Sequence, residues 1–135
     1  MTVTVYLDAS FLMLSAKFHV DVVSEAEELL QGRAEFTVPA AVVRELERLA
    51  RGRGAPGRDA RVALALIRKG KIRCVPSREP LNADTALTEA SQLPNVIVAT
   101  ADLELRRKIR SAGKPVIFFR EKAKLELEGI EPGYW

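Results

Sequence analysis

Cysteine and histidine are nearly absent from this 135-residue chain, which has one of each. The single cysteine, Cys74, excludes an intrachain disulfide and any metal site built from several thiolates. The single histidine, His19, lies between Phe18 and Val20 in no recognisable motif, so a Ser-His-Asp triad is not expected. Aromatic residues make up only 6% of the chain, which argues against a surface that binds single strands by base stacking.

Long apolar runs are also absent. No stretch approaches the ~20 consecutive apolar residues that a membrane-spanning helix needs, and the N-terminus has no charged region ahead of an apolar run. We therefore expect a cytoplasmic protein with no membrane partner. The composition, 47% apolar and 29% charged, fits one globular domain with a real core. We place this single domain at residues 1–129 and leave a C-terminal tail at 130–135.

The charge is unevenly distributed along the chain. The net charge is +3, but segment 44–78 contains eleven Lys and Arg residues against three acidic ones, so the remainder is net acidic. A basic block on a nearly neutral chain is typical of a surface that binds a polyanion. A solvated helix face produces the same pattern, so the block alone leaves both interpretations open.

Short β-branched runs alternate with segments of helical periodicity. We predict strands at 3–7, 35–38, 72–75, 96–100 and 116–119. Apolar residues three or four positions apart predict helices at 22–31, 40–51, 59–69, 83–92 and 103–112. This alternation favours an α/β fold, a mainly parallel sheet with helices on both faces. We expect residues 51–57 to form a loop between two helices, and residues 120–129 to form a last helix.

Four acidic residues fall near the ends of predicted strands. Asp8 follows the first strand, and Asp102 follows the fourth. Asp84 lies in the first turn of the helix after the third strand, and Glu45 lies in the second turn of the helix after the second strand. Because the carboxyl ends of parallel strands converge on one edge of a sheet, we expect these carboxylates to meet there. Taken singly, each has a simpler explanation as a helix cap or a surface residue.

Four carboxylates brought together, with no Lys or Arg among them, repel one another unless a cation neutralises them. Hard oxygen ligands select Mg²⁺ or Mn²⁺, which keep several waters and bind phosphate on the open side. Such ions activate water and stabilise the leaving oxygen of a phosphodiester. An acidic pocket beside a basic block therefore indicates a metal-dependent nuclease that holds the nucleic-acid backbone on its basic residues.

Four segments resemble the motifs of the PIN-domain endoribonuclease family. In chain order they are VYLDASFL, PAAVVRELERL, NADTAL and VIVATADLELRRKIR, and they cover most of the sequence. The resemblance implies a three-layer α/β/α fold whose five-stranded parallel sheet has the strand order 3-2-1-4-5. It also implies a catalytic set that holds Mg²⁺ or Mn²⁺, made of Asp8, Glu45, Asp84 and Asp102. Ser10 and Thr100 fall where the family has hydroxyl residues that hydrogen-bond the site acids, although many members have Asn in place of Ser10.

The other acidic and basic residues near these motifs are interpreted in the light of this resemblance. Glu104 is a candidate fifth acid, but we favour a solvated helix residue for it. We interpret Asp21 as a helix cap and Glu89 as a surface residue. RNA is the implied partner, and we assign its phosphate contacts to five residues of the basic block: Arg44, Arg48, Arg51, Arg53 and Arg58. Because most family members self-associate, the resemblance also implies a homodimer.

Two segments bear on the role within the family. LDASFLMLSAKFHVD and LRRKIRSAGKPVIFFREKAKLELEG are most similar to PIN proteins that process small-subunit ribosomal RNA and to their archaeal relatives. Ribosomal RNA processing, with ribosome-assembly factors as partners, is therefore our first interpretation. Toxin nucleases of the VapC type, which pair with an antitoxin, share the four acids and a similar length. A catalytically silent PIN fold that binds RNA or supports assembly is a further alternative, and the presence of all four acids counts against it.

Three other sites that bind or transfer phosphate are excluded. A haloacid-dehalogenase phosphatase needs a second Asp two residues after the first, and Ser10 stands there. A response-regulator receiver needs an Asp at the close of the third strand, where this chain has Val75 and Pro76. The glycine-rich segment at 51–57 follows a helix and lacks the Gly-Lys-Ser/Thr ending of a phosphate-binding P-loop.

Overall fold

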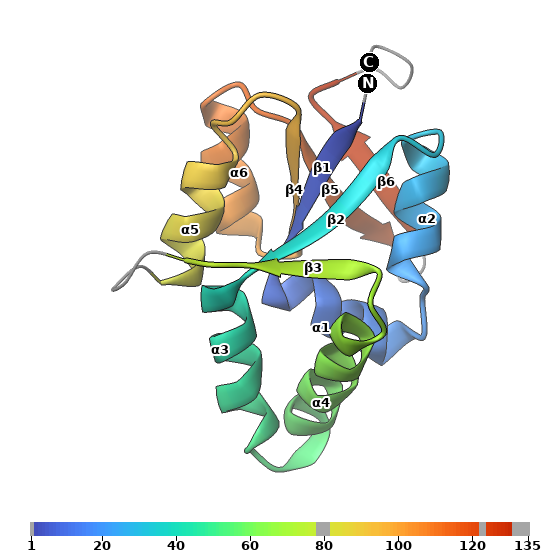
Figure 1. The fold of residues 1–135 in the computed structure, drawn as a ribbon, viewed down its shortest axis with the longest axis vertical. Helices are drawn as coiled ribbons and strands as arrows, with labels where there is room; N and C mark the ends of the chain where they lie inside the picture. The colour runs from blue at the N-terminus through green and yellow to red at the C-terminus, as the bar shows by residue number, and fades with distance from the viewer. Residues whose placement is uncertain (1, 78–81, 122–123, 131–135) are drawn as a thin grey trace.

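The computed structural model describes residues 2–77, 82–121 and 124–130. Their strands form one sheet in the order β3-β2-β1-β4-β5-β6 (Figure 1). The strands are β1 (Val3–Leu7), β2 (Ala34–Pro39), β3 (Ile72–Val75), β4 (Val96–Ala99), β5 (Val116–Glu121) and β6 (Lys124–Glu128). Strands β1 to β5 pair in parallel, whereas β6 pairs antiparallel with β5. The α/β class and the order of the five predicted strands are confirmed, and the sheet gains a sixth strand.

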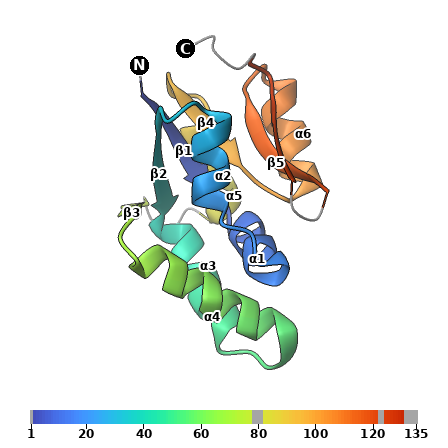
Figure 2. The same ribbon diagram turned by 90° about the vertical axis from the view of Figure 1, so that its right-hand side faces the viewer.

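Helices cover both faces of the sheet and the edge where the parallel strands end (Figures 1 and 2). They are α1 (Ala9–Phe18), α2 (Val22–Leu29), α3 (Ala40–Ala50), α4 (Gly54–Arg68), α5 (Ala83–Ala90) and α6 (Leu103–Ser111). In Figure 1, α5 and α6 lie on one side of the sheet and α2 on the other, while α1, α3 and α4 lie below the strand ends. Among the described residues, no helix has both the length and the apolar character that a membrane crossing requires.

Helix α1 forms where no helix is predicted. Phe11 and Leu12 are fully buried and Met13 packs against the core, so the segment lacks the broad polar face on which the periodicity argument depends. Its start does carry a signal, because Asp8 is the N-cap and accepts a hydrogen bond from the Ala9 N–H. The residue that marks the end of β1 therefore also begins α1.

Helix α4 begins at Gly54 rather than at residue 59, so the predicted loop at 51–57 is shorter than expected. Pro56 stands in the first helical turn, where its missing N–H removes no helical hydrogen bond. Gly57 is buried, and a Cβ at this position would collide with the Gly52 carbonyl group. Arg61 closes the turn by donating to the Ala50 carbonyl oxygen over 2.8 Å. The α3–α4 turn is thus closely packed.

The prediction of a last helix at residues 120–129 is wrong, because β5 extends to Glu121 and Lys124–Glu128 forms β6. Leu125 and Leu127 alternate with glutamates, which is the two-residue period of a half-buried strand. Both leucines pack against the core. A helix would point side chains two positions apart to opposite sides and would take one leucine away from the core.

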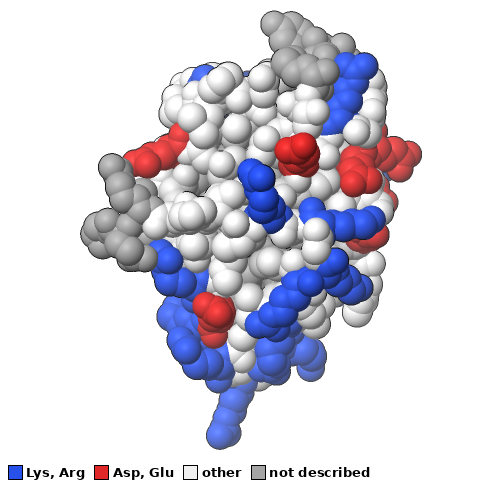
Figure 3. All heavy atoms as spheres, viewed as in Figure 1, with Lys and Arg blue, Asp and Glu red and all other residues white. Residues whose placement is uncertain are grey.

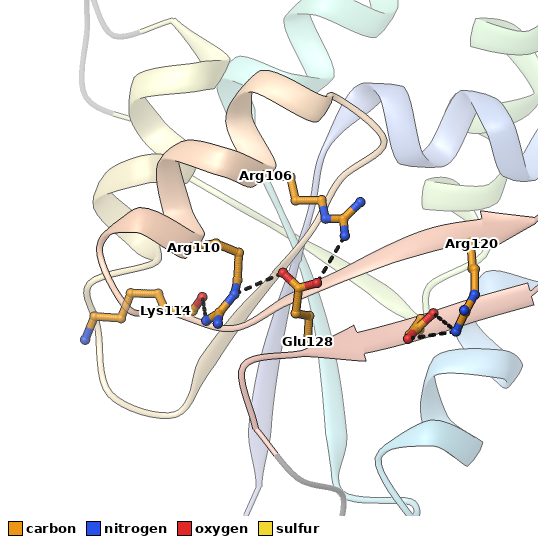
Figure 4. A network of polar contacts seen from close by, with 6 residues as sticks. Arg106, Arg110, Lys114, Arg120 and Glu128 are labelled. Carbon is orange, nitrogen blue, oxygen red and sulfur yellow. Dashed lines mark hydrogen bonds and ion pairs between the residues drawn. The ribbon is translucent and has the colours of Figure 1, made fainter.

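Strand β6 is also tied to α6 by charge (Figure 4). Glu128 accepts hydrogen bonds from Arg106 over 3.1 Å and from Arg110 over 3.0 Å. These arginines lie one turn apart on α6, so a single strand carboxylate joins two turns of the helix. A second ion pair, between Arg120 and Glu126 at 3.0 Å, crosses from β5 to β6.

Two predictions fall on residues that the structure does not describe. The predicted tail at 130–135 lies outside the described residues except for Ile130, and Arg78, the last residue of the basic block, also lies outside them. The rest of the basic block belongs to described parts of α3, α4 and β3 and the turns between them.

Candidate active site

The four predicted acids lie at the edge of the sheet where the parallel strands end. Asp8 follows β1 and caps α1, and Asp102 follows β4 and caps α6. Asp84 lies in the first turn of α5, after the N-cap Asn82. Glu45 lies in α3, which follows β2 directly. The β–α connections therefore deliver one acid each from four different places in the sequence to the same edge.

Asp8 is the most enclosed of these acids, with 7% of its surface exposed. Its Oδ1 accepts from the Ala9 N–H over 2.8 Å. Its Oδ2 accepts from the Thr100 hydroxyl over 2.7 Å and from the Ser10 hydroxyl over 2.9 Å. Burial raises the pKa of this carboxyl, and the charge of Asp102 adds to the rise; together they outweigh the three hydrogen bonds, which lower the pKa.

The two hydroxyls connect Asp8 to the start of α6. The Ser10 hydroxyl oxygen accepts from the Ala101 N–H over 3.0 Å, and that of Thr100 accepts from the Asp102 N–H, also over 3.0 Å. Thr100 is fully buried. This network fixes the two strand ends of β1 and β4 relative to each other, with Asp8 and Asp102 on either side of it.

Asp102 holds its carboxylate at the N-terminus of α6. Oδ1 accepts from the Glu104 N–H over 2.9 Å and from the Leu105 N–H over 3.3 Å. No hydrogen bond from a described residue to Oδ2 is found, so this oxygen can face a ligand. Glu104 itself is exposed, in line with its interpretation as a solvated residue.

The pKa of the Glu45 carboxyl depends on all three of the other acids. Partial burial raises the pKa of its carboxyl, and Asp8 adds the largest repulsion. Arg48 opposes this effect, while Asp102 and Asp84 raise the pKa further. Since three carboxylates from three other elements act on the ionisation of Glu45, the four acids share one electrostatic environment.

The expectation that no Lys or Arg stands among the four acids is wrong. Lys108 of α6 places its Nζ 3.2 Å from Oδ2 of Asp84 on α5. Both side chains are about half exposed, 54% and 46%, so the pair is worth less than about 1 kcal/mol. The sequence could not reveal this contact, because it depends on how α5 packs beside α6.

The donor set fits a hard divalent cation. All four groups offer carboxylate oxygens, the ligands that Mg²⁺ and Mn²⁺ prefer, and their mutual repulsion is what a cation would relieve. Within the described part of the chain, no three carboxylate, imidazole or thiol groups already lie close enough to form a metal cage. Mg²⁺ keeps several of its waters and does not need a closed protein cage, so an open arrangement of carboxylates is compatible with it.

The residues assigned to RNA binding are all exposed and follow the α3–α4 hairpin. They are Arg44, Arg48, Arg51, Arg53 and Arg58, which we call the basic hairpin. In Figure 3, Lys and Arg side chains gather at the lower end of the molecule, over the region of α3 and α4 in Figure 1. Because α3 also carries Glu45, this basic surface begins next to the four acids.

Two other acids have roles away from this edge. Asp21 caps α2, as predicted, and accepts from both the N–H and the hydroxyl of Ser24. These hydrogen bonds lower the pKa of the Asp21 carboxyl. Glu89 is an exposed residue of α5.

Residues 5–122 match the family model described as a PIN like domain. Ribonuclease VapC4 of Methanocaldococcus jannaschii is 31% identical over 124 residues, covering 91% of this chain and 95% of that protein. Ribonuclease VapC9 of Archaeoglobus fulgidus is 32% identical over 126 residues, covering 93% of this chain and 89% of that protein.

Two solved structures share the fold. The structure of the PIN domain endonuclease Utp24 has a TM-score of 0.79 at 22% identity, covering 94% of this chain and 92% of that one. A domain of a functionally unknown protein from Methanocaldococcus jannaschii has a TM-score of 0.60 at 19% identity, covering 96% and 99%. At these identities the two likenesses bear on the fold alone.

Proposed function

Because this chain belongs to the PIN-like domain family, we propose that it is an endoribonuclease that hydrolyses RNA phosphodiester bonds with Mg²⁺ or Mn²⁺. The observation that carries the proposal is the position of Asp8, Glu45, Asp84 and Asp102, which come from four elements to the edge where the parallel strands end. Their mutual repulsion, which raises the pKa of Glu45, supports it. The two archaeal relatives named as ribonucleases support the same activity.

We propose that the metal ligands come from the four acids Asp8, Glu45, Asp84 and Asp102. When bound, such an ion supplies a reactive water and stabilises the leaving oxygen of the phosphodiester. The protein contributes the positions of the ligands. Thr100 and Ser10 hold Asp8 in a fixed orientation, and the first turn of α6 holds Oδ1 of Asp102.

The test is cleavage of a generic single-stranded RNA with Mn²⁺, which EDTA should abolish. We expect Asp8→Asn to lower the rate of RNA cleavage at least about a hundredfold, because replacing a metal-binding carboxylate removes transition-state charge stabilisation. The matched control is Glu104→Gln, an acidic residue on α6 that is exposed and outside the four acids. Full activity of folded Asp8→Asn, with metal present, would contradict the site assignment.

We further propose that the basic hairpin binds RNA through its phosphates. Neutralising Arg51, Arg53 and Arg58 should weaken binding of all sequences alike and flatten the salt dependence, since each single-strand phosphate contact contributes a log–log slope of roughly −0.7. The matched control removes the same charge at the far end of α4, with Arg68, Lys69 and Lys71 changed to Gln; these residues are exposed. If the two triple variants change the salt dependence of RNA binding equally, the basic hairpin is an ordinary solvated surface.

Two biological roles are considered for this nuclease: ribosomal RNA processing, and a toxin paired with an antitoxin. Similarity to the two archaeal VapC ribonucleases, which extends over more than 90% of this chain, favours the toxin role. Growth arrest on expression, relieved by co-expression of a short reading frame encoded immediately upstream, would support the toxin. Accumulation of unprocessed small-subunit ribosomal RNA on depletion would support processing instead. Absence of any metal-dependent cleavage, with RNA binding retained, would support the silent scaffold.

We also propose that the protein acts as a homodimer, as the resemblance implies. Sedimentation equilibrium of the purified chain tests this directly. A monomer at concentrations where cleavage is active would contradict it.

A further inference from the structure

Lys108 places its ammonium group against one of the four acids. Its Nζ lies 3.2 Å from Oδ2 of Asp84, and within the described ranges no other group is found to hydrogen-bond this carboxylate. The contact crosses from α6 to α5, which pack side by side (Figure 1). The positive charge of Lys108 is therefore part of the candidate active site, although the residue lies in the middle of a helix.

The local sequence favours a different partner for Lys108. Glu104 lies four residues earlier on α6, and a glutamate four residues before a lysine is the favourable order for an ion pair along a helix. Among the ion pairs of the described residues, Lys108 pairs with α5 and not with Glu104. Arg106 and Arg110 of the same helix bond Glu128 of β6. The orientation of Lys108 thus depends on the packing of α6 against α5.

A nuclease site built from four acids needs more positive charge than one metal ion brings. One divalent cation neutralises only half of the charge of four ionised carboxylates, and an RNA phosphate is itself an anion. Lys108 can supply further positive charge, because its ammonium group has three donors on a flexible stem. Its pair with Asp84 is weak enough to exchange, since both side chains are about half exposed.

We propose that Lys108 binds the RNA phosphate and that it changes partner when the metal ion binds. In the metal-free protein its ammonium group pairs with Asp84. A cation held by Asp84 displaces this group, which then donates to an oxygen of the phosphate at the site. Metal and RNA should therefore each strengthen the binding of the other, because such coupling is reciprocal. This inference rests on the proposed nuclease function and adds to it the residue that couples the two ligands.

The coupling is measured as the ratio of two dissociation constants for a short labelled single-stranded RNA, one in EDTA and one in saturating Ca²⁺. Ca²⁺ takes oxygen ligands as Mg²⁺ does, and a gel shows that the strand stays intact. Lys108→Met removes the charge at the same side-chain length, and Lys108→Arg keeps the charge. The matched control is Arg107→Met, which removes a charge from the exposed neighbouring position on α6. Thermal melts should show that all three variants fold.

We expect the ratio for wild type to exceed that for Lys108→Met about fivefold or more, a typical size for coupling between two ligands. Arg107→Met and Lys108→Arg should keep most of the wild-type ratio. In EDTA, Lys108→Met and Arg107→Met should bind RNA within about twofold of each other, because Asp84 then holds Lys108. At saturating Mn²⁺, Lys108→Met should cleave RNA at least about tenfold more slowly than wild type, because a donor to the reacting phosphate is lost.

The outcomes separate this inference from the function on which it rests. If Lys108→Met keeps the wild-type ratio, or loses RNA affinity equally in EDTA and in Ca²⁺, the change of partner is wrong, and Mn²⁺-dependent cleavage by wild type still supports the nuclease. Equal or faster cleavage by Lys108→Met at saturating Mn²⁺ would also overturn the inference, since Lys108 would then only compete with the metal.

The converse result is equally clear. If the ratio depends on Lys108 while wild type cleaves nothing, the coupling stands and the nuclease function fails. If Ca²⁺ and Mn²⁺ change neither the RNA affinity nor the melting temperature of wild type, both the metal site and the role of Lys108 are wrong.

Discussion

A carboxyl group that is partly buried among other carboxyl groups is easier to protonate than one in water. For Glu45, burial raises the pKa first, and the charge of Asp8 is the largest of the repulsions that raise it further. Its folded-state pKa therefore lies above that of the unfolded chain. The contribution of Glu45 to folding of the metal-free protein is most favourable at low pH, and it is lost as the pH rises through the folded-state pKa.

Replacing Glu45 with Gln should therefore stabilise the metal-free protein at neutral pH. We expect the melting temperature in EDTA at pH 7 to rise by a few degrees, since 1 kcal/mol corresponds to about 4 °C for a domain of this length. The difference from wild type should shrink as the pH falls toward 4. Thermal melts across this range measure it, and Glu47→Gln, an exposed residue of the same helix, is the control. A Glu45→Gln protein that melts lower than wild type at pH 7 would contradict the repulsion.

Sequence reasoning could locate the four acids because their positions follow from the fold. An acid at a strand end of a parallel sheet must lie at one known edge, and Asp8 and Asp102 need no further information. Lys108 is different. It reaches Asp84 only because α5 and α6 pack side by side, and nothing in the spacing of 24 residues between them indicates this contact.

At the scale of elements, the sequence correctly predicts the helices and strands whose pattern of apolar residues matches the pattern of burial. Strands β1 to β5 and helices α2, α3, α5 and α6 carry such patterns and lie close to their predicted positions. Helix α1 was missed because buried and half-buried side chains surround it, which hides the helical period. Strand β6 differs from its predicted helix because a short run of charged residues among leucines fits either element, and only the packing of both leucines against the core selects the strand. Each error came from a segment whose environment is set by distant parts of the chain.

The α3–α4 turn depends on the absence of a side chain at Gly57. A methyl group there would meet the Gly52 carbonyl, which belongs to the backbone and cannot rotate away. We expect Gly57→Ala to cost about 1–3 kcal/mol of unfolding free energy, as overpacking does. At Gly52 a methyl group would lie 3.2 Å from the Leu49 carbonyl oxygen, a contact that a small shift relieves. Urea denaturation of both variants measures the difference, and equal stabilities would contradict the close packing of this turn.

At the scale of the whole molecule, opposite charges are sorted into neighbouring regions. The four acids lie where the strands end, and the basic hairpin extends from the same edge on α3 and α4. The small net charge of +3 hides this arrangement. Because like charges lie close together within each region, they repel one another and destabilise the protein. A cation bound to the acids and RNA phosphates bound to the basic hairpin would offset this repulsion. The metal-free, RNA-free protein is therefore expected to be less stable than the complex with either ligand.

Lys108 makes this expectation testable, because it forms an ion pair with Asp84, one of the four acids of the proposed metal site. A divalent cation that binds Asp84 must compete with the Lys108 ammonium group, 3.2 Å away. Lys108→Met keeps the length of the side chain and removes its charge, so we expect Mn²⁺ to bind about two- to fivefold more tightly, the equivalent of one weak surface ion pair. Titration of the Mn²⁺-dependent rise in melting temperature gives the apparent affinity, since a ligand at a hundred times its dissociation constant stabilises by about 2.7 kcal/mol.

The control for Lys108 is its neighbour Arg107, which is exposed on the same helix. Arg107→Met removes the same charge from nearly the same place, so it reports how far a general change in potential alters cation affinity. Only the difference between the two variants belongs to the ion pair with Asp84. If both raise Mn²⁺ affinity equally, Lys108 acts at a distance and does not compete at Asp84. If Mn²⁺ stabilises none of the three proteins, the four acids do not form a metal site, whatever their mutual repulsion.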